Sequence, residues 1–157
     1  MPERNERVMA FDYGIRWIGV AVGQAMLGTG TAVARFQARD GIPRWEEVDS
    51  LLQEWQPQRL VVGLPLNMDG SESDMSLRAR KFSRRLDSRF RGPVSLIDER
   101  LTSYAAKRDH EARGRALDYS REGAGVDGEA AVIILEDWFR SACADGSRTD
   151  STTGQAG

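Results

Sequence analysis

RVMAFDYGIRWIGVAV, residues 7–22, holds two apolar runs that set the architecture of this 157-residue chain. Arg7–Tyr13 and Trp17–Val22 are each long enough for a buried strand, and the residues between them suit a tight turn. After two glycines, residues 31–37 alternate well enough for a third strand. Three strands joined by short connections predict an antiparallel meander.

Helices and strands alternate after this meander. A helix is expected from Pro43, with apolar residues at helical spacing, until Pro57 ends it. Residues 59–64 form a continuous apolar run of the kind buried on both faces of a sheet, and a loop at 65–70 follows. A helix at 74–90 is expected next, with Ser71 or Ser73 as its N-cap. A fifth strand at 94–97 and helices at 101–112 and 126–142 complete the prediction.

This order of elements predicts an α/β fold. Alternating helices and strands imply right-handed crossovers between parallel strands. We therefore expect a mixed five-stranded sheet, an antiparallel meander plus parallel strands, with helices on both faces. Residues 1–144 are expected to form one domain, and residues 145–157, which lack large apolar side chains, a disordered tail.

Composition excludes several classes of protein. The single cysteine, Cys143, rules out a disulfide framework and a cysteine-rich zinc site. The longest wholly apolar run, residues 130–135, is far too short to span a bilayer. The first seven residues are polar and show no secretory signal. The expectation is a cytoplasmic protein with no membrane partner, and its four tryptophans, including Trp17, are expected in the core.

Charge is distributed unevenly along the chain. Residues 76–115 carry 12 basic and 5 acidic side chains, a net charge of +7, whereas the flanking segments carry −4 and −5. A basic block of this kind favours a polyanionic partner. Only Lys81 and Lys107 are lysines among the 22 basic residues. Arginine suits phosphate recognition, although genomic base composition can give the same bias.

Acidic residues stand at one end of three predicted segments. Asp12 ends the first strand, Asp98 and Glu99 follow the fifth, and Asp127 begins the last helix. The carboxyl ends of parallel strands share one edge of a sheet, where ligands bind in open α/β folds. Clustered carboxylates repel one another, and oxygen ligands favour Mg²⁺ or Mn²⁺ over zinc. Taken singly, each acid could instead form a turn or cap a helix.

Four motifs in this order resemble those of the YqgF family. They are Phe11–Gly14 followed by Ile18–Gly23, Val62–Gly70, Asp98–Thr102, and Val126–Asp127 with the alanines at 130 and 131. Members of that family are named as RNase H-like Holliday junction resolvases and as pre-16S rRNA nucleases. The motifs cover residues 8–139, and their combination is specific although each alone would be modest.

The resemblance implies an RNase H-like fold and an endonuclease with two metal ions, Mg²⁺ or Mn²⁺, about 4 Å apart. Asp12, Glu99 and Asp127 would be the catalytic and metal-binding acids, with Asp12 bridging the metals and Asp98 as the alternative to Glu99. One departure is the stretch Gly123–Gly125, where the family commonly has basic residues. The residues expected to contact nucleic acid are Arg16, Asn67, Arg78, Arg80, Lys81, Arg84, Arg100 and Thr102.

Three functions compete with the favoured one, which is processing of the 5′ end of pre-16S rRNA in ribosome biogenesis. A Holliday junction resolvase would act on branched DNA and should be a symmetric dimer. A non-catalytic nucleic-acid-binding module could retain the same fold. A nucleotide-binding ATPase is also compatible with Asp12–Gly14, but such enzymes need a second domain, and no phosphate-binding Gly-rich loop ending in Lys is present. The expected state is a monomer or a weak homodimer.

Overall fold

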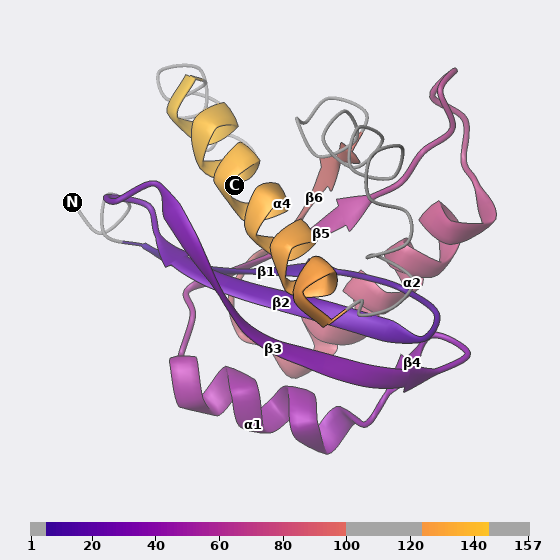
Figure 1. The fold of residues 1–157 in the computed structure, drawn as a ribbon, viewed down its shortest axis with the longest axis horizontal. Coiled ribbons are helices and arrows are strands. Elements are labelled where there is room, and N and C mark those ends of the chain that lie inside the picture. Colours follow the sequence, from indigo (N-terminus) through magenta and orange to yellow (C-terminus); the bar gives the residue numbers. More distant parts are fainter. Residues whose placement is uncertain (1–5, 100–123, 145–157) are drawn as a thin grey trace.

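A computed structural model describes residues 6–99 and 124–144, with side chains of the last helix described from Glu129 to Ala142. Its centre is a six-stranded sheet in the order β4-β3-β2-β1-β5-β6 (Figure 1). The strands are β1 (Arg7–Asp12), β2 (Trp17–Gln24), β3 (Thr29–Arg39), β4 (Ile42–Pro43), β5 (Arg59–Leu64) and β6 (Val94–Asp98). Strands β1 to β4 pair antiparallel, and β5 pairs parallel with both β1 and β6. The predicted mixed sheet is confirmed.

The predicted count of five strands is wrong because the chain forms the additional short strand β4. Asp40 and Gly41 both adopt positive φ angles, 52° and 81°, which turn the chain so that Ile42 pairs with Arg39. Pro43 therefore belongs to β4, and helix α1 (Trp45–Trp55) begins two residues later than expected. Strand β3 is also longer than predicted.

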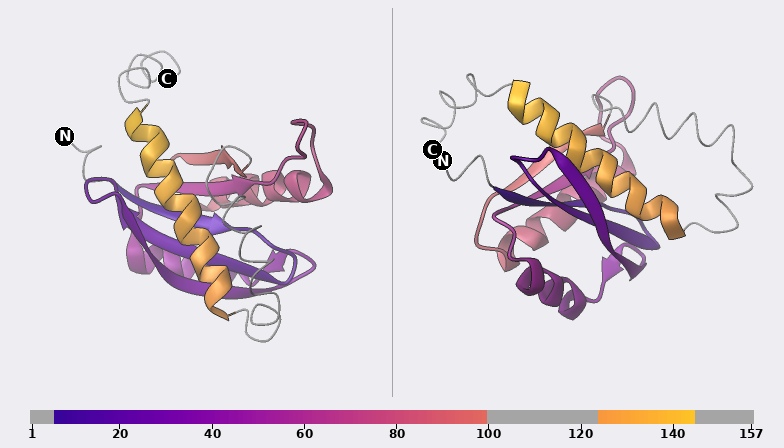
Figure 2. Two further views of the ribbon diagram at one scale, coloured as in Figure 1. Left: turned by 45° about the horizontal axis from the view of Figure 1, so that its top comes forward. Right: turned by 60° about the vertical axis from the view of Figure 1, so that its left-hand side comes forward.

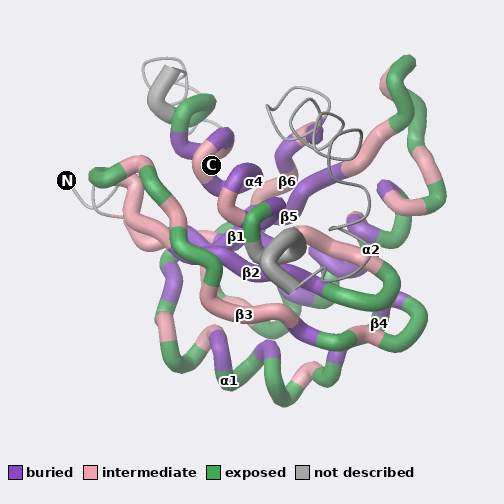
Figure 3. Tube along the Cα trace, viewed as in Figure 1, coloured by how far each residue is buried: buried purple, intermediate pink, exposed green. Residues whose placement is uncertain are grey.

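Helices cover both faces of the sheet, as expected (Figure 2). Helices α1 and α2 (Asp74–Arg89) pack on one face, where Val48, Phe82 and Leu86 contact strand residues such as Phe11. Helix α4 (Ala124–Ala144) lies across β1, β2 and β3 on the other face. Burial is greatest in the central strands, whose side chains contribute to the hydrophobic core on both faces of the sheet (Figure 3).

Helix α2 has a well-defined beginning. The hydroxyl of Ser73, one of the two predicted N-caps, accepts a hydrogen bond from the Ser76 backbone N–H. The Ser76 hydroxyl in turn accepts one from the Ser73 backbone N–H. The Ser73 hydroxyl also donates to the Pro65 carbonyl, 2.7 Å away. Ser73 thereby both caps α2 and links its start to the residue that follows β5.

Trp17 departs from the expected burial, because its side chain is 37% exposed. The last residue of β1, Asp12, pairs with Gly19, so Trp17 extends beyond the end of the neighbouring strand. The Arg35 guanidinium lies over the Trp17 ring, 3.8 Å from its centroid.

Several expectations lie outside the described residues. These are the helix at 101–112, the tail at 145–157, Arg100, Thr102 and the side chain of Asp127. Among the helices that are described, none is long and apolar enough to cross a membrane.

Candidate active site

Asp12 occupies the end of β1, on the sheet face that α4 covers. Val8 and Ala10 pack against α4, and alternation along the strand gives Asp12 the same orientation. Its partner in β2 is Gly19. Asp12 is half-buried. The end of β1 therefore presents an acidic group in a partly enclosed position.

Glu99 is a buried carboxylate, only 8% exposed, immediately after β6. It lies over Gly63 of β5, because a Cβ atom added at Gly63 would collide with the Glu99 carboxylate. The same atom would lie 2.9 Å from Cδ1 of Ile134 in α4. The Glu99 side chain thus occupies the space between β5 and α4 that a larger residue at position 63 would fill.

The strand register relates these two acids. Phe11 of β1 pairs with Val62 of β5, so the next residues along the parallel strands are Asp12 and Gly63. Adjacent strands lie about 4.8 Å apart. Glu99, seated on Gly63, is consequently brought to the same face and the same end of the sheet as Asp12.

Asp98 differs from Glu99 in its orientation. It pairs with Leu64 in the ladder between β5 and β6, where the preceding residue, Ile97, packs in the cluster under α4. Alternation directs Asp98 toward the opposite face. Of the two neighbouring acids, Glu99 is therefore the one that shares a face with Asp12.

Asp127 is the fourth residue of α4, the helix that covers this face. Among the residues whose side chains are described, no three acidic, histidine or cysteine side chains form a metal-binding group. Asp12 and Glu99 supply carboxylate oxygens, which suit Mg²⁺ or Mn²⁺. A buried carboxylate close to a second one is stabilised by a cation, so this pair fits a divalent metal.

The predicted nucleic-acid contacts that fall among the described residues lie in two loops and on α2. Arg16 is exposed in the turn between β1 and β2. The Asn67 side-chain amide donates to the Ser71 hydroxyl and to the Glu72 carbonyl, at 3.0 and 3.2 Å. Asn67 therefore orders the loop that follows β5, at the same end of the sheet as Asp12.

The basic residues of α2 fall into two groups. Arg80 pairs with Glu72 at 2.8 Å, Arg89 pairs with Asp49 at 2.8 Å, and Arg78 lies 3.4 Å from Asp40. The hydrogen bonds from Arg80 lower the pKa of Glu72. A hydrogen bond from Arg89 likewise lowers the pKa of Asp49.

Three further cations of α2, Lys81, Arg84 and Arg85, are exposed and form no ion pair with a described residue. The basic residues of α2 therefore differ in their availability: Arg80 is held by a carboxylate, whereas Lys81 and Arg84 are available to an external anion. Charge counting along the sequence does not separate these two groups.

Gly63 is the site residue that sequence reasoning missed. The signal was present, because a glycine within the run Arg59–Leu64 weakens a strand and marks a position where another group approaches the backbone closely. Which group approaches depends on the pairing of β5 with β6.

Comparisons with known proteins find relatives that match most of this chain. A family model described as RuvX: Holliday junction resolvase matches residues 6–141. A protein of Marinobacter nauticus named "Putative pre-16S rRNA nuclease" is 54% identical over 136 residues, covering 87% of this chain and 94% of the relative. A protein of the same name from Chromohalobacter salexigens is 57% identical over 140 residues, covering 88% and 93%.

Among solved structures, T. thermophilus RuvC in complex with Holliday junction substrate aligns with a TM-score of 0.55 and 14% identity. The alignment covers 88% of this chain and 96% of that one. Similarity at this level concerns the fold, and it confirms the RNase H-like architecture of the mixed sheet.

The position of the Glu99 side chain over Gly63 can be tested by substitution. Gly63→Ala should reduce the free energy of unfolding by about 1–3 kcal/mol, the usual cost of overpacking, as measured by urea denaturation. Because the Glu99 carboxylate causes part of this cost, the same substitution should be less destabilising in a Glu99→Ala background. An equal loss in both backgrounds would show that Glu99 does not occupy the space above Gly63.

Proposed function

We propose that this chain, which belongs to the RuvX family of Holliday junction resolvases and is a nuclease, cleaves phosphodiester bonds with divalent metal held by Asp12, Glu99 and Asp127. The observation that carries the proposal is the burial of Glu99 over Gly63, on the face and at the end of the sheet where Asp12 lies. Carboxylate oxygens held at one edge of a sheet are ligands that suit a hard divalent metal ion.

The chain's own contribution is to hold these acids in fixed positions. Asp12 ends a strand that is paired on both sides, and Glu99 is confined between β5 and α4. Groups held on strands need little reorganisation when a reaction begins. Bound Mg²⁺ or Mn²⁺ would supply an activated water and stabilise the leaving oxygen of the phosphodiester. In a two-metal site, Asp12 would be the ligand shared by the two ions, as the family resemblance implies.

We assign the 5′ end of pre-16S rRNA as the substrate, in the cytoplasm and in ribosome biogenesis. The support is the name of the two relatives, which are more than half identical over most of this chain. Branched DNA is the second candidate, supported by the description of the matching family. A resolvase that cuts two symmetric strands would act as a dimer, whereas a processing nuclease can act as a monomer or weak homodimer.

A cleavage assay separates these substrates. Purified protein should cleave labelled precursor rRNA in Mg²⁺ or Mn²⁺ and not in EDTA. Asp12→Asn should abolish cleavage because the residue can no longer contribute a charged ligand. Asp87→Asn is the matched control, since it removes one exposed carboxylate from α2. Cleavage of a four-way DNA junction alone would favour the resolvase, and full activity of Asp12→Asn would contradict the assigned site.

Nucleic-acid binding should depend on the cations of α2 that pair with no carboxylate of residues 6–99. Log K falls as log salt rises, and each lost phosphate contact reduces the magnitude of this slope by about 0.7 to 0.9. Arg84→Ser should reduce the magnitude by roughly this amount. Arg80→Ser should reduce it less, because Glu72 holds that guanidinium. Filter binding of the same RNA over a series of salt concentrations measures both slopes. Equal reductions would mean that Arg80 exchanges Glu72 for phosphate.

A further inference from the structure

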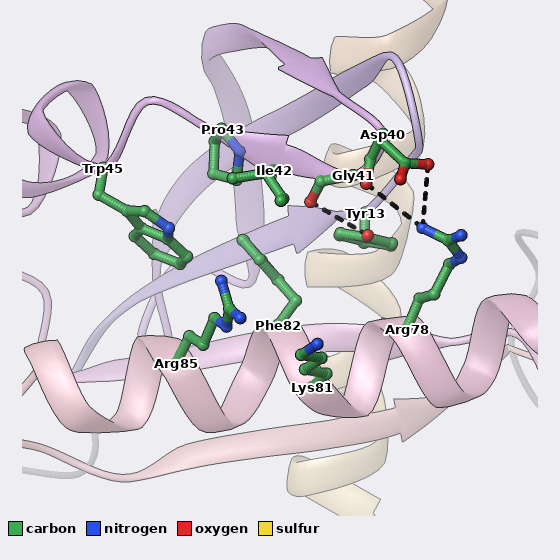
Figure 4. Close-up of a pocket in the computed structure, with 10 residues that line it drawn as sticks. All are labelled: Tyr13, Asp40, Gly41, Ile42, Pro43, Trp45, Arg78, Lys81, Phe82 and Arg85. Carbon is green, nitrogen blue, oxygen red and sulfur yellow. Dashed lines mark hydrogen bonds and ion pairs between the residues drawn. The ribbon is translucent and has the colours of Figure 1, made fainter.

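A pocket of about 360 Å³ lies between α2 and the turn that joins β3 to β4 (Figure 4). Its volume falls at the small end of the range of about 300–1,000 Å³ typical of ligand sites. Tyr13 lines it and directly follows Asp12 in the chain. The pocket thus lies near the end of β1 that carries the candidate metal site, on the sheet face that α1 and α2 cover.

The rim of the pocket is held by hydrogen bonds. The Tyr13 hydroxyl donates to the Gly41 carbonyl at 3.1 Å, and the Gly41 N–H donates to the Ile15 carbonyl at 2.8 Å. Arg78 of α2 donates to the Asp40 carbonyl at 3.3 Å. Position 41 suits glycine alone, because φ is 81° and a Cβ atom would collide with the Tyr13 hydroxyl. The turn between β3 and β4 is therefore fixed against both β1 and α2.

Aromatic rings form one wall. Phe82 is buried beneath the pocket, with the rings of Tyr13 and Trp45 at 5.1 and 5.7 Å from its own. Tyr13 and Trp45 are half-buried. Ile42, which lies across the pocket from α2, is 52% exposed. A planar or apolar part of a ligand would meet aromatic and aliphatic carbon here.

The other wall is cationic. Arg78, Lys81 and Arg85 follow one another along one side of α2 and all line the pocket, as the close-up shows (Figure 4). Asp40 offsets the charge of Arg78. Lys81 and Arg85 are like charges four residues apart, an arrangement that destabilises a helix. No carboxylate among the described residues pairs with either of them. The pocket accordingly joins two unneutralised cations to an aromatic wall.

We propose that this pocket binds a nucleoside phosphate, with the phosphate between Lys81 and Arg85 and the nucleoside against Tyr13, Ile42 and Trp45. Cations match the phosphate, and aromatic side chains contact a base of any sequence. The nucleotide can be free or can belong to a bound strand. The second source rests on the proposed function, because such a strand would pass from the pocket to the end of β1.

Titrations of the whole chain in EDTA test the pocket without the candidate metal site. The probes are adenosine 5′-monophosphate, adenosine and inorganic phosphate, followed by the amide resonance of Gly41 and the indole resonance of Trp45. The monophosphate should shift both resonances and bind more tightly than either fragment. Lys81→Ser/Arg85→Ser should weaken its binding about tenfold or more, since two charge-assisted contacts are lost. The control, Arg44→Ser/Arg91→Ser, removes two exposed cations that do not line the pocket and should leave mononucleotide affinity unchanged.

A second variant guards against a general effect of losing charge from α2. Ile42→Glu places a carboxylate at an exposed position across the pocket from α2. Because a carboxylate repels phosphate, this variant should also bind the monophosphate more weakly. A 5′-phosphorylated pentanucleotide then distinguishes the sources of the ligand. Tighter binding than the monophosphate, with the same two resonances shifted, assigns the pocket to a strand. Binding of the monophosphate alone assigns it to a free nucleotide.

The proposal is overturned if no probe shifts these resonances, or if Lys81→Ser/Arg85→Ser binds the monophosphate as wild type does. Failure of the nuclease assignment would look different. Asp12→Asn would then retain cleavage, or wild type would show none, while nucleotide binding in EDTA would be unaffected.

Discussion

The missing side chain at Gly63 is the constraint on which the candidate site depends. Strands β1, β5 and β6 run parallel, so their carboxyl ends meet at one edge, but this alone does not bring two carboxylates together. Glu99 reaches the face of Asp12 because position 63 leaves room between β5 and α4. Gly63 and the strand register thereby place two carboxylates at one position, and their oxygens suit a small, hard cation.

Helix α2 carries two kinds of basic residue: some form ion pairs that hold the helix in place, and others are available to a ligand. Its pairs with Asp40 and Asp49 join it to the β3–β4 turn and to α1, and the pair with Glu72 supports its own N-terminus. Glu72 and Asp49 both have lowered pKa values, so the stabilisation from these exposed pairs is present at neutral pH and is lost as pH falls through the lowered values. Lys81 and Arg85 form no ion pair within the described part of the chain and line a pocket beside aromatic rings, and there we infer a ligand.

Sequence reasoning predicted the parts of the fold that depend on continuous apolar pattern. Strands β1, β2 and β5, the Ser73 cap and the mixed sheet follow from local residues. Strand β4 was missed because its two residues owe their pairing to the positive φ angles at Asp40 and Gly41. Trp17 was expected in the core, but it lies beyond the end of β1. For the site, the sequence indicated Asp12 and left Asp98 and Glu99 as alternatives. The contact of Glu99 with Gly63 arises only when the strands and helices pack. The same holds for the ion pairs of α2 that join residues about forty positions apart.

Thermal unfolding with and without metal tests most directly whether Asp12 and Glu99 form one cation site. Melts of wild type, Asp12→Asn and Glu99→Gln are compared in EDTA and in millimolar Mn²⁺. In EDTA, Asp12→Asn should be as stable as wild type or more so, because it relieves repulsion between carboxylates. Mn²⁺ at a hundredfold excess over Kd should stabilise wild type by about 2.7 kcal/mol and both variants far less. Equal metal-induced shifts in all three proteins would contradict a shared site, and a large loss of stability of Asp12→Asn in EDTA would make Asp12 a structural residue.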